Sequence, residues 1–79
     1  MATGIEVLDT VAVAVDVPAH GLTAGEVGAV VEVLASGEAY EVEFCDPTGA
    51  TYGLHTLRTS QLIPLHTRGR ALRLPVRAA

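Results

Sequence analysis

The chain has 79 residues, with nine acidic and five basic side chains and a formal net charge of −4. A chain of this length buries only about 60% of the surface that its unfolded form exposes, which leaves no room for a separate cofactor or substrate domain. Its hydrophobic content of 49% argues against disorder. No apolar run reaches the roughly 18 residues of a membrane span, and no signal peptide is recognisable. Because the lone Cys45 has no internal disulfide partner, we expect a protein of the reducing cytoplasm.

Charge is distributed unevenly along the chain. All five basic residues are arginines, and four of them follow His66: Arg68, Arg70, Arg73 and Arg77. Residues 1–66 carry nine acidic side chains against Arg58 alone, a net charge of −8. A body this acidic repels phosphate backbones, so we expect no nucleic-acid binding. It suits a cationic protein partner or the chain's own basic segment, and the alternative is that the acidity only keeps the protein soluble.

The first half of the chain predicts two strands separated by a loop. Residues 7–17 alternate with the period of a half-buried strand, and four valines share the inward face: Val11, Val13, Val15 and Val17. Pro18 ends this strand, and residues 18–25 are expected to form a loop. For residues 28–35 we expect Val31 and Val33 inward. Glu32 then points outward, on the same face as Val30 and Leu34.

The second half predicts three more strands. Residues 39–46 alternate cleanly, with Tyr40, Val42 and Phe44 inward and Glu41 and Glu43 outward. A tight connection at residues 36–38 precedes this strand, and the turn signal of residues 46–49 ends it. For residues 51–57 we expect Tyr52 and Leu54 inward and His55 on the opposite face. Residues 59–61 predict a 3₁₀ turn, and Pro64 marks the short strand of residues 62–65 as an edge strand or the site of a bulge.

Five short strands without a sustained helical period predict an all-β fold, specifically a small SH3-like five-stranded barrel. We place the barrel at residues 1–66 and a basic, extended C-terminal tail at residues 67–79. From Leu72 the tail alternates apolar residues with arginines, and Pro75 is unfavourable in a helix interior.

Two resemblances support this fold. The segment from Gly25 to Val33 resembles the Gly-x-x-Gly-x-Val core of KOW-type and other SH3-like barrels. A longer pattern over about residues 7 to 66 resembles the bacterial family called domain of unknown function 4926. It comprises Leu8-Asp9-Thr10-Val11, His20-Gly21-Leu22, Gly25-Glu26-Val27-Gly28, Tyr40-Glu41-Val42-Glu43-Phe44 and Gln61-Leu62. The tail lies outside this pattern.

These resemblances imply a fold and only a broad function. The family has no established activity, and its resemblance implies a role in toxin–antitoxin or toxin–immunity gene pairs. A wider likeness, at the level of fold, is to the barrel of nitrile hydratase beta subunits and related accessory proteins. KOW barrels often bind RNA through basic surfaces with exposed aromatic side chains. This chain has one arginine in its body and its three aromatic residues at predicted inward positions, so we do not extend RNA binding to it.

The residues that could carry catalysis or bind a metal are isolated. His20, His55 and His66 match no ligand spacing, and no Cys-x-x-Cys motif is present. Cys45 follows Phe44, on the same face as Glu43 and next to Asp46, whereas a reactive thiolate needs positive charge nearby. Ser36 and Ser60 are turn residues without a base at a recognisable spacing. We therefore expect a protein that is not an enzyme, with no metal and no cofactor.

Three outward glutamates are the strongest candidates for a binding surface. Glu32, Glu41 and Glu43 fall on one face of the predicted hairpin, where neighbouring carboxylates repel unless something cationic lies there. Asp46, and also Glu26, extend this face. The functional interpretation is a docking surface for a basic protein, and the alternative is a solvated face.

The candidate partners follow from the two charge blocks. The leading hypothesis is an antitoxin- or immunity-type protein that binds a basic toxin through its acidic face. The alternative is a small accessory subunit that packs on a larger enzyme through apolar contacts such as Val30, Leu34 and Leu65. Arg68, Arg70, Arg73 and Arg77 are expected to contact an acidic face in cis or in trans, and the latter would give a homodimer. A loosely packed arm, or weak and salt-sensitive nucleic-acid contact, are the other interpretations of the tail.

Overall fold

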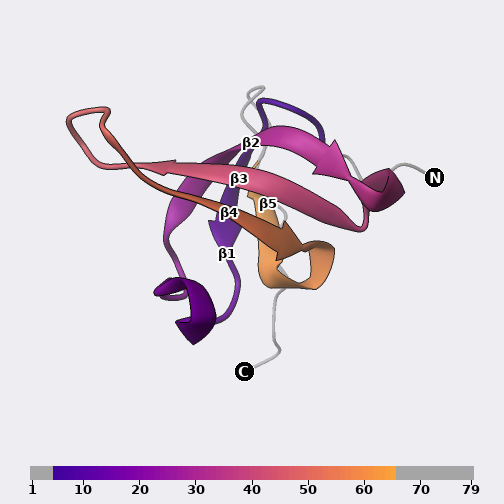
Figure 1. The fold of residues 1–79 in the computed structure, drawn as a ribbon, viewed down its shortest axis with the longest axis horizontal. Coiled ribbons are helices and arrows are strands. Elements are labelled where there is room, and N and C mark those ends of the chain that lie inside the picture. The colour runs from indigo at the N-terminus through magenta and orange to yellow at the C-terminus, as the bar shows by residue number, and fades with distance from the viewer. Residues whose placement is uncertain (1–4, 66–79) are drawn as a thin grey trace.

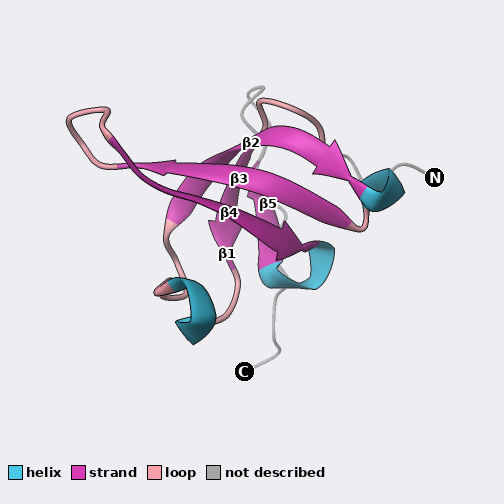
Figure 2. Ribbon diagram, in the orientation of Figure 1, coloured by secondary structure: helices cyan, strands magenta, loops and turns pink. Residues whose placement is uncertain are grey.

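The computed structural model of the protein describes residues 5–65, which form strands and 3₁₀ turns but no α-helix. The elements are β1 (Thr10–Val13), the 3₁₀ turn η1 (Pro18–His20), β2 (Val27–Leu34), the 3₁₀ turn η2 (Ala35–Gly37), β3 (Ala39–Cys45), β4 (Thr51–Arg58), the 3₁₀ turn η3 (Thr59–Gln61) and β5 (Leu62–Leu65). The predicted all-β fold is confirmed, including the 3₁₀ turn before the last strand (Figure 2). The predicted tail, with its four arginines, lies outside the described residues.

The five strands form one antiparallel sheet in the order β4-β3-β2-β1-β5. Figure 1 shows β1 and β5 crossing behind β3 and β4 at a steep angle, so the sheet is strongly bent and folds over its own inner face. β4 and β5 are the two edge strands, and the edge position of β5 is one of the two alternatives that Pro64 indicated. This bend lets a single small sheet enclose a core.

The core contains apolar side chains from every strand and from the segments around β1. Its members are Ile5, Val11, Val13, Val17, Leu22, Val30, Tyr40, Val42, Phe44, Leu57 and Leu62. The predicted inward alternation of Tyr40, Val42 and Phe44 is confirmed, and all three are fully buried. The Tyr40 hydroxyl donates a hydrogen bond to the Gly37 carbonyl at 2.9 Å, which satisfies its polar end.

The first strand is shorter than predicted. β1 ends at Val13, whose amide donates to the Glu26 carbonyl, and Ala14 already bonds to the Gln61 carbonyl. Val15 is 50% exposed, so its predicted inward position is wrong. Val17 returns to the core because it pairs with Leu22 in an isolated bridge on the far side of η1.

The inward side of β2 also differs from the prediction. Val30 is fully buried, whereas Val31 and Val33 are 39% and 38% exposed. The reason is a bulge: Val30 pairs with Val42 and Glu32 pairs with Glu41, so Val31 is an extra residue between the two pairs. Glu32 nevertheless lies on the outer face, as predicted. Val33 pairs with the buried Tyr40, so it lies on the inner face as predicted, although it is partly exposed. An alternating pattern read without the bulge places Val30 outward, and that part of the prediction is wrong.

A second irregularity changes β4. Phe44 pairs with Gly53 and Cys45 pairs with Thr51, which leaves Tyr52 as the additional residue. Tyr52 and Leu54 are 53% and 54% exposed, so the prediction that they face inward is wrong. The core contact of β4 comes instead from Leu57, which is almost fully buried.

Candidate functional site

The candidate site is on the outer face of the β2–β3 hairpin. Glu32 and Glu41 are directly opposite each other in the ladder, and Glu43 lies two residues further along β3 on the same face. Glu43 is flanked by Ala29 on β2 and Leu54 on β4. The sheet therefore brings together the three glutamates that the sequence places outward, and we call Glu32, Glu41 and Glu43 the acidic patch.

Hydroxyl groups on β4 orient two of these carboxylates. Thr56 donates to Glu41 Oε1 at 2.7 Å, and Thr51 donates to Glu43 Oε2 at 2.6 Å. Both threonines pair with residues of β3 across the ladder, so these bonds hold the glutamate side chains against the sheet. Arg58 is the only arginine or lysine of the part of the chain described, and no salt bridge there neutralises the patch.

Asp46 has a different role from the acidic patch. Its Oδ1 atom accepts bonds from the Thr48 amide at 2.9 Å, the Thr48 hydroxyl at 2.6 Å and the Ala50 amide at 3.0 Å. These bonds, the one from the Thr48 hydroxyl first among them, lower the pKa of the Asp46 carboxyl from its usual value. The carboxylate is therefore used to stabilise the turn between β3 and β4.

Glu26 likewise acts within the chain. Its carboxylate accepts the Thr23 amide at 2.6 Å and the Tyr52 hydroxyl at 2.7 Å. The bond from the Thr23 amide is the main cause of a lowered Glu26 pKa, and the bond to Glu26 raises the pKa of Tyr52. This contact ties the loop between β1 and β2 to β4. No sequence signal pointed to it, because the exposed position of Tyr52 depends on the irregularity in β4.

Two histidines far apart in the sequence meet in the structure. The rings of His20, in η1, and His55, in β4, stack with centroids 4.6 Å apart and an angle of 18° between them. The His55 ring lies 6.2 Å from that of the buried Phe44. The prediction that these histidines are unrelated turn and surface residues missed this contact. Within residues 5–65, no three or more His, Cys, Asp or Glu side chains are grouped so as to hold a metal ion.

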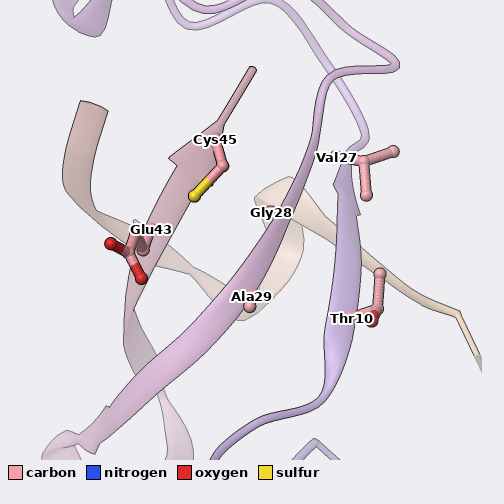
Figure 3. A pocket seen from close by; sticks show the side chains of 6 residues that line it. All are labelled: Thr10, Val27, Gly28, Ala29, Glu43 and Cys45. Carbon is pink, nitrogen blue, oxygen red and sulfur yellow. The ribbon is translucent and has the colours of Figure 1, made fainter. Parts of the chain in front are cut away.

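Beside the acidic patch the outer face carries an open hollow of about 220 Å³. It is lined by Thr10, Val27, Gly28, Ala29, Glu43 and Cys45. Figure 3 shows Glu43 and Cys45 projecting from β3 on one side and Thr10 and Val27 on the other, with the small residues of β2 between them. The thiol of Cys45 is free and exposed. We refer to this feature as the hollow.

Gly28 allows β2 and β3 to lie close together at the floor of the hollow. A Cβ atom at this position would lie 2.7 Å from the Glu43 carbonyl oxygen and 2.8 Å from a methyl carbon of Val42. Only glycine allows β2 and β3 to approach this closely at the point where β2 begins.

A comparison with models of protein families shows to which family the chain belongs. The profile of the family described as Domain of unknown function (DUF4926) matches residues 7–64, nearly the whole of the described sheet. The chain belongs to the DUF4926 family. The resemblance found in the sequence is thereby confirmed. The residues matched by the DUF4926 profile include the acidic patch and the hollow but not residues 65–79. Comparisons with curated proteins and with solved structures gave no match.

No helix among residues 5–65 of this DUF4926 protein has the length and apolar character needed to cross a membrane.

Proposed function

We propose that this DUF4926 protein is a non-catalytic protein-binding module that captures a cationic protein through the acidic patch. The observation that carries this proposal is the direct opposition of Glu32 and Glu41 in the β2–β3 ladder. Like charges at opposed positions of a sheet destabilise the pair. A lysine or arginine of a partner placed over both carboxylates would remove that cost and add charge-assisted hydrogen bonds.

The surroundings of the patch favour a protein partner. Leu54 on β4 is an exposed apolar side chain that pairs with Glu43 across the ladder. Protein interfaces combine apolar contact with charged groups at the margin, and complementary charge mainly determines specificity and association rate. The concrete form of this proposal is an antitoxin- or immunity-type protein that blocks a basic toxin in the cytoplasm, where a free and exposed Cys45 stays reduced.

A second candidate function is an accessory subunit that packs on a larger enzyme. The structure removes one of its proposed contacts, since Val30 is fully buried in the core, and leaves Leu34 and Leu65 half-buried. The exposed Val27 and Leu54 supply apolar surface on the outer face for such packing. This candidate predicts binding that tolerates charge reversal in the acidic patch.

The test is capture of a basic protein from the native lysate by the full chain and by two charge-reversal variants. Glu41→Lys changes the acidic patch, and Glu38→Lys makes the same change of charge outside it, at an exposed residue of the η2–β3 junction. We expect equal capture by the wild type and the Glu38 variant and loss of capture by the Glu41 variant. Circular dichroism confirms that each variant is folded. Equal loss in both variants, or capture of a partner that is not basic, would refute the proposal.

A further inference from the structure

The size of the hollow limits what it can bind. Its volume of about 220 Å³ is below the roughly 300–1,000 Å³ of sites for drug-sized ligands. It is open on one side, along the outer face, and its floor is formed by Gly28 and Ala29 (Figure 3). A site of these dimensions suits one protruding side chain of a peptide.

The chemistry of the walls indicates which side chain. Val27 and Ala29 offer apolar surface, and Glu43 lines the opposite wall. Arginine matches this arrangement, because its apolar stem packs on hydrocarbon and its guanidinium pairs with a carboxylate. Thr51 donates to Glu43 Oε2 from the side of β4, which fixes the carboxylate against the sheet.

The nearest source of arginines is the chain itself. β5 ends at Leu65, and Leu65 pairs with Thr10, which lines the hollow. Thr10 pairs in turn with Ala29, and Ala29 with Glu43, so one row of residues leads across the sheet from the end of β5 to the carboxylate. Three strand spacings separate Leu65 from Glu43, about 14 Å.

The segment that follows is long enough to cover this distance. Arg68 is three residues beyond Leu65 and Arg70 is five, and an extended chain reaches about 10 Å and about 17 Å over those lengths. Residues 66–79 carry four arginines and no acid, against the net charge of −8 on the rest of the chain. Tethering at β5 also makes the encounter intramolecular, which raises the effective concentration of these arginines at the hollow.

We propose that residues 66–79 bind in cis across the outer face of the sheet and place one arginine in the hollow, paired with Glu43. This inference deepens the proposed function, because the segment then covers the surface that a cationic partner needs and the partner has to displace it. The acidic patch and the hollow form one surface, for which residues 66–79 compete with the cationic partner. Binding of the partner is then coupled to release of the arginine-rich segment.

The test is disulfide trapping in the full chain. Cys45 lines the hollow and is the only cysteine of the sequence, so Ala71→Cys supplies a single possible partner thiol. Under mild oxidation we expect an intramolecular disulfide, recognised by the mass of the monomer and by a faster-migrating band. Replacing Glu43 by glutamine in the same background should slow its formation about fivefold, the effect of losing one charge-assisted contact. About 1 M salt should slow it similarly, since charges are then screened over a few ångströms.

Two controls accompany the trapping experiment. Glu38→Gln removes the same charge outside the hollow and should leave the trapping rate unchanged. Reaction of each thiol with a small neutral reagent corrects for differences in thiolate reactivity. Equal trapping rates in the Glu43 and Glu38 variants would overturn the proposal, because they indicate random collisions of the segment. A cross-linked dimer would overturn it in favour of binding to a second copy. The assay contains no partner, so its outcome is independent of the capture experiment.

Discussion

Glu32 and Glu41 occupy directly opposed positions on neighbouring strands, and both lie on the outer face of the sheet. Glu41 is held there by the Thr56 hydroxyl at 2.7 Å. A protein selected for stability alone gains by replacing one member of such a pair with a cation, because opposite charges at opposed positions are favourable. The pair therefore indicates that stability is given up here for a different requirement, which we propose is binding.

Glu32→Lys is accordingly expected to stabilise the fold while weakening capture of the cationic partner. The new lysine would pair with Glu41 and raise the free energy of unfolding by about 0.2–1 kcal/mol. Urea denaturation at low salt measures this change. Glu38→Lys alters the net charge equally and serves as the control for general relief of repulsion. If both variants gain the same stability, the opposed pair carries no specific cost and gives no support to a binding role for the acidic patch.

Local sequence signals predicted the elements of this fold well. The alternation of β3 is read correctly because every one of its residues from Ala39 to Phe44 stays in register with a neighbouring strand. The turn at residues 46–49 is predicted by its proline and glycine, and the Gly49 amide donates to the Asp46 carbonyl at 2.8 Å as expected. Both signals depend on residues close in sequence.

The errors arise where strand pairing, rather than the strand itself, determines which face a residue occupies. A bulge inserts a residue and exchanges the two faces beyond it, as at Val31 and Tyr52. Nothing in an alternating pattern marks the position of such an insertion. Contacts between distant segments, such as His20 with His55, are equally invisible, because they depend on how the loop folds back over the sheet. The acidic patch was predictable because Glu41 and Glu43 belong to the regular strand β3.

Gly28→Ala tests the close approach of β2 and β3 below the hollow. The added methyl group would meet the Glu43 carbonyl oxygen at 2.7 Å, and backbone cannot move aside at small cost. We expect a loss of about 1–3 kcal/mol, as for overpacking of a core. Gly53→Ala is the matched control, because its nearest contact, at 2.9 Å, is the end of the His55 side chain, which can rotate. Thermal or urea unfolding of both variants should show the larger loss for Gly28, and the reverse order would contradict a backbone clash at that position.

The turn at Asp46 should make part of the stability dependent on pH. Its hydrogen bonds lower the pKa of the folded-state carboxyl below the usual 3.8, so the stabilisation is present above that value and is lost as the pH falls through the folded-state pKa. Asp46→Asn is expected to be less stable than the wild type at about pH 7 and to approach it at about pH 2. Urea unfolding at the two pH values measures the convergence. A difference from the wild type that is constant with pH would show that the charge on Asp46 does not contribute.

The stacking of His20 on His55 is expected to hold the loop between β1 and β2 against the sheet. The two ring centroids lie 4.6 Å apart, and the residues that pair with each other on either side of η1, Val17 and Leu22, are buried in the core. His20→Ala should cost about 0.5–1.5 kcal/mol, the usual contribution of an aromatic pair. It should also speed hydrogen exchange at the Leu22 amide, which donates to the Val17 carbonyl at 3.1 Å.

The matched variant His20→Phe keeps a planar ring at the same position and should retain most of the protection at Leu22. The amide of Val42, in the centre of the sheet, serves as the internal reference, because it should respond only to a change in global stability. Faster exchange at Leu22 alone identifies local loosening of the loop. If His20→Phe and His20→Ala expose Leu22 equally, ring stacking does not hold the loop, and its position depends on the Val17–Leu22 bridge and the bond from Tyr52 to Glu26.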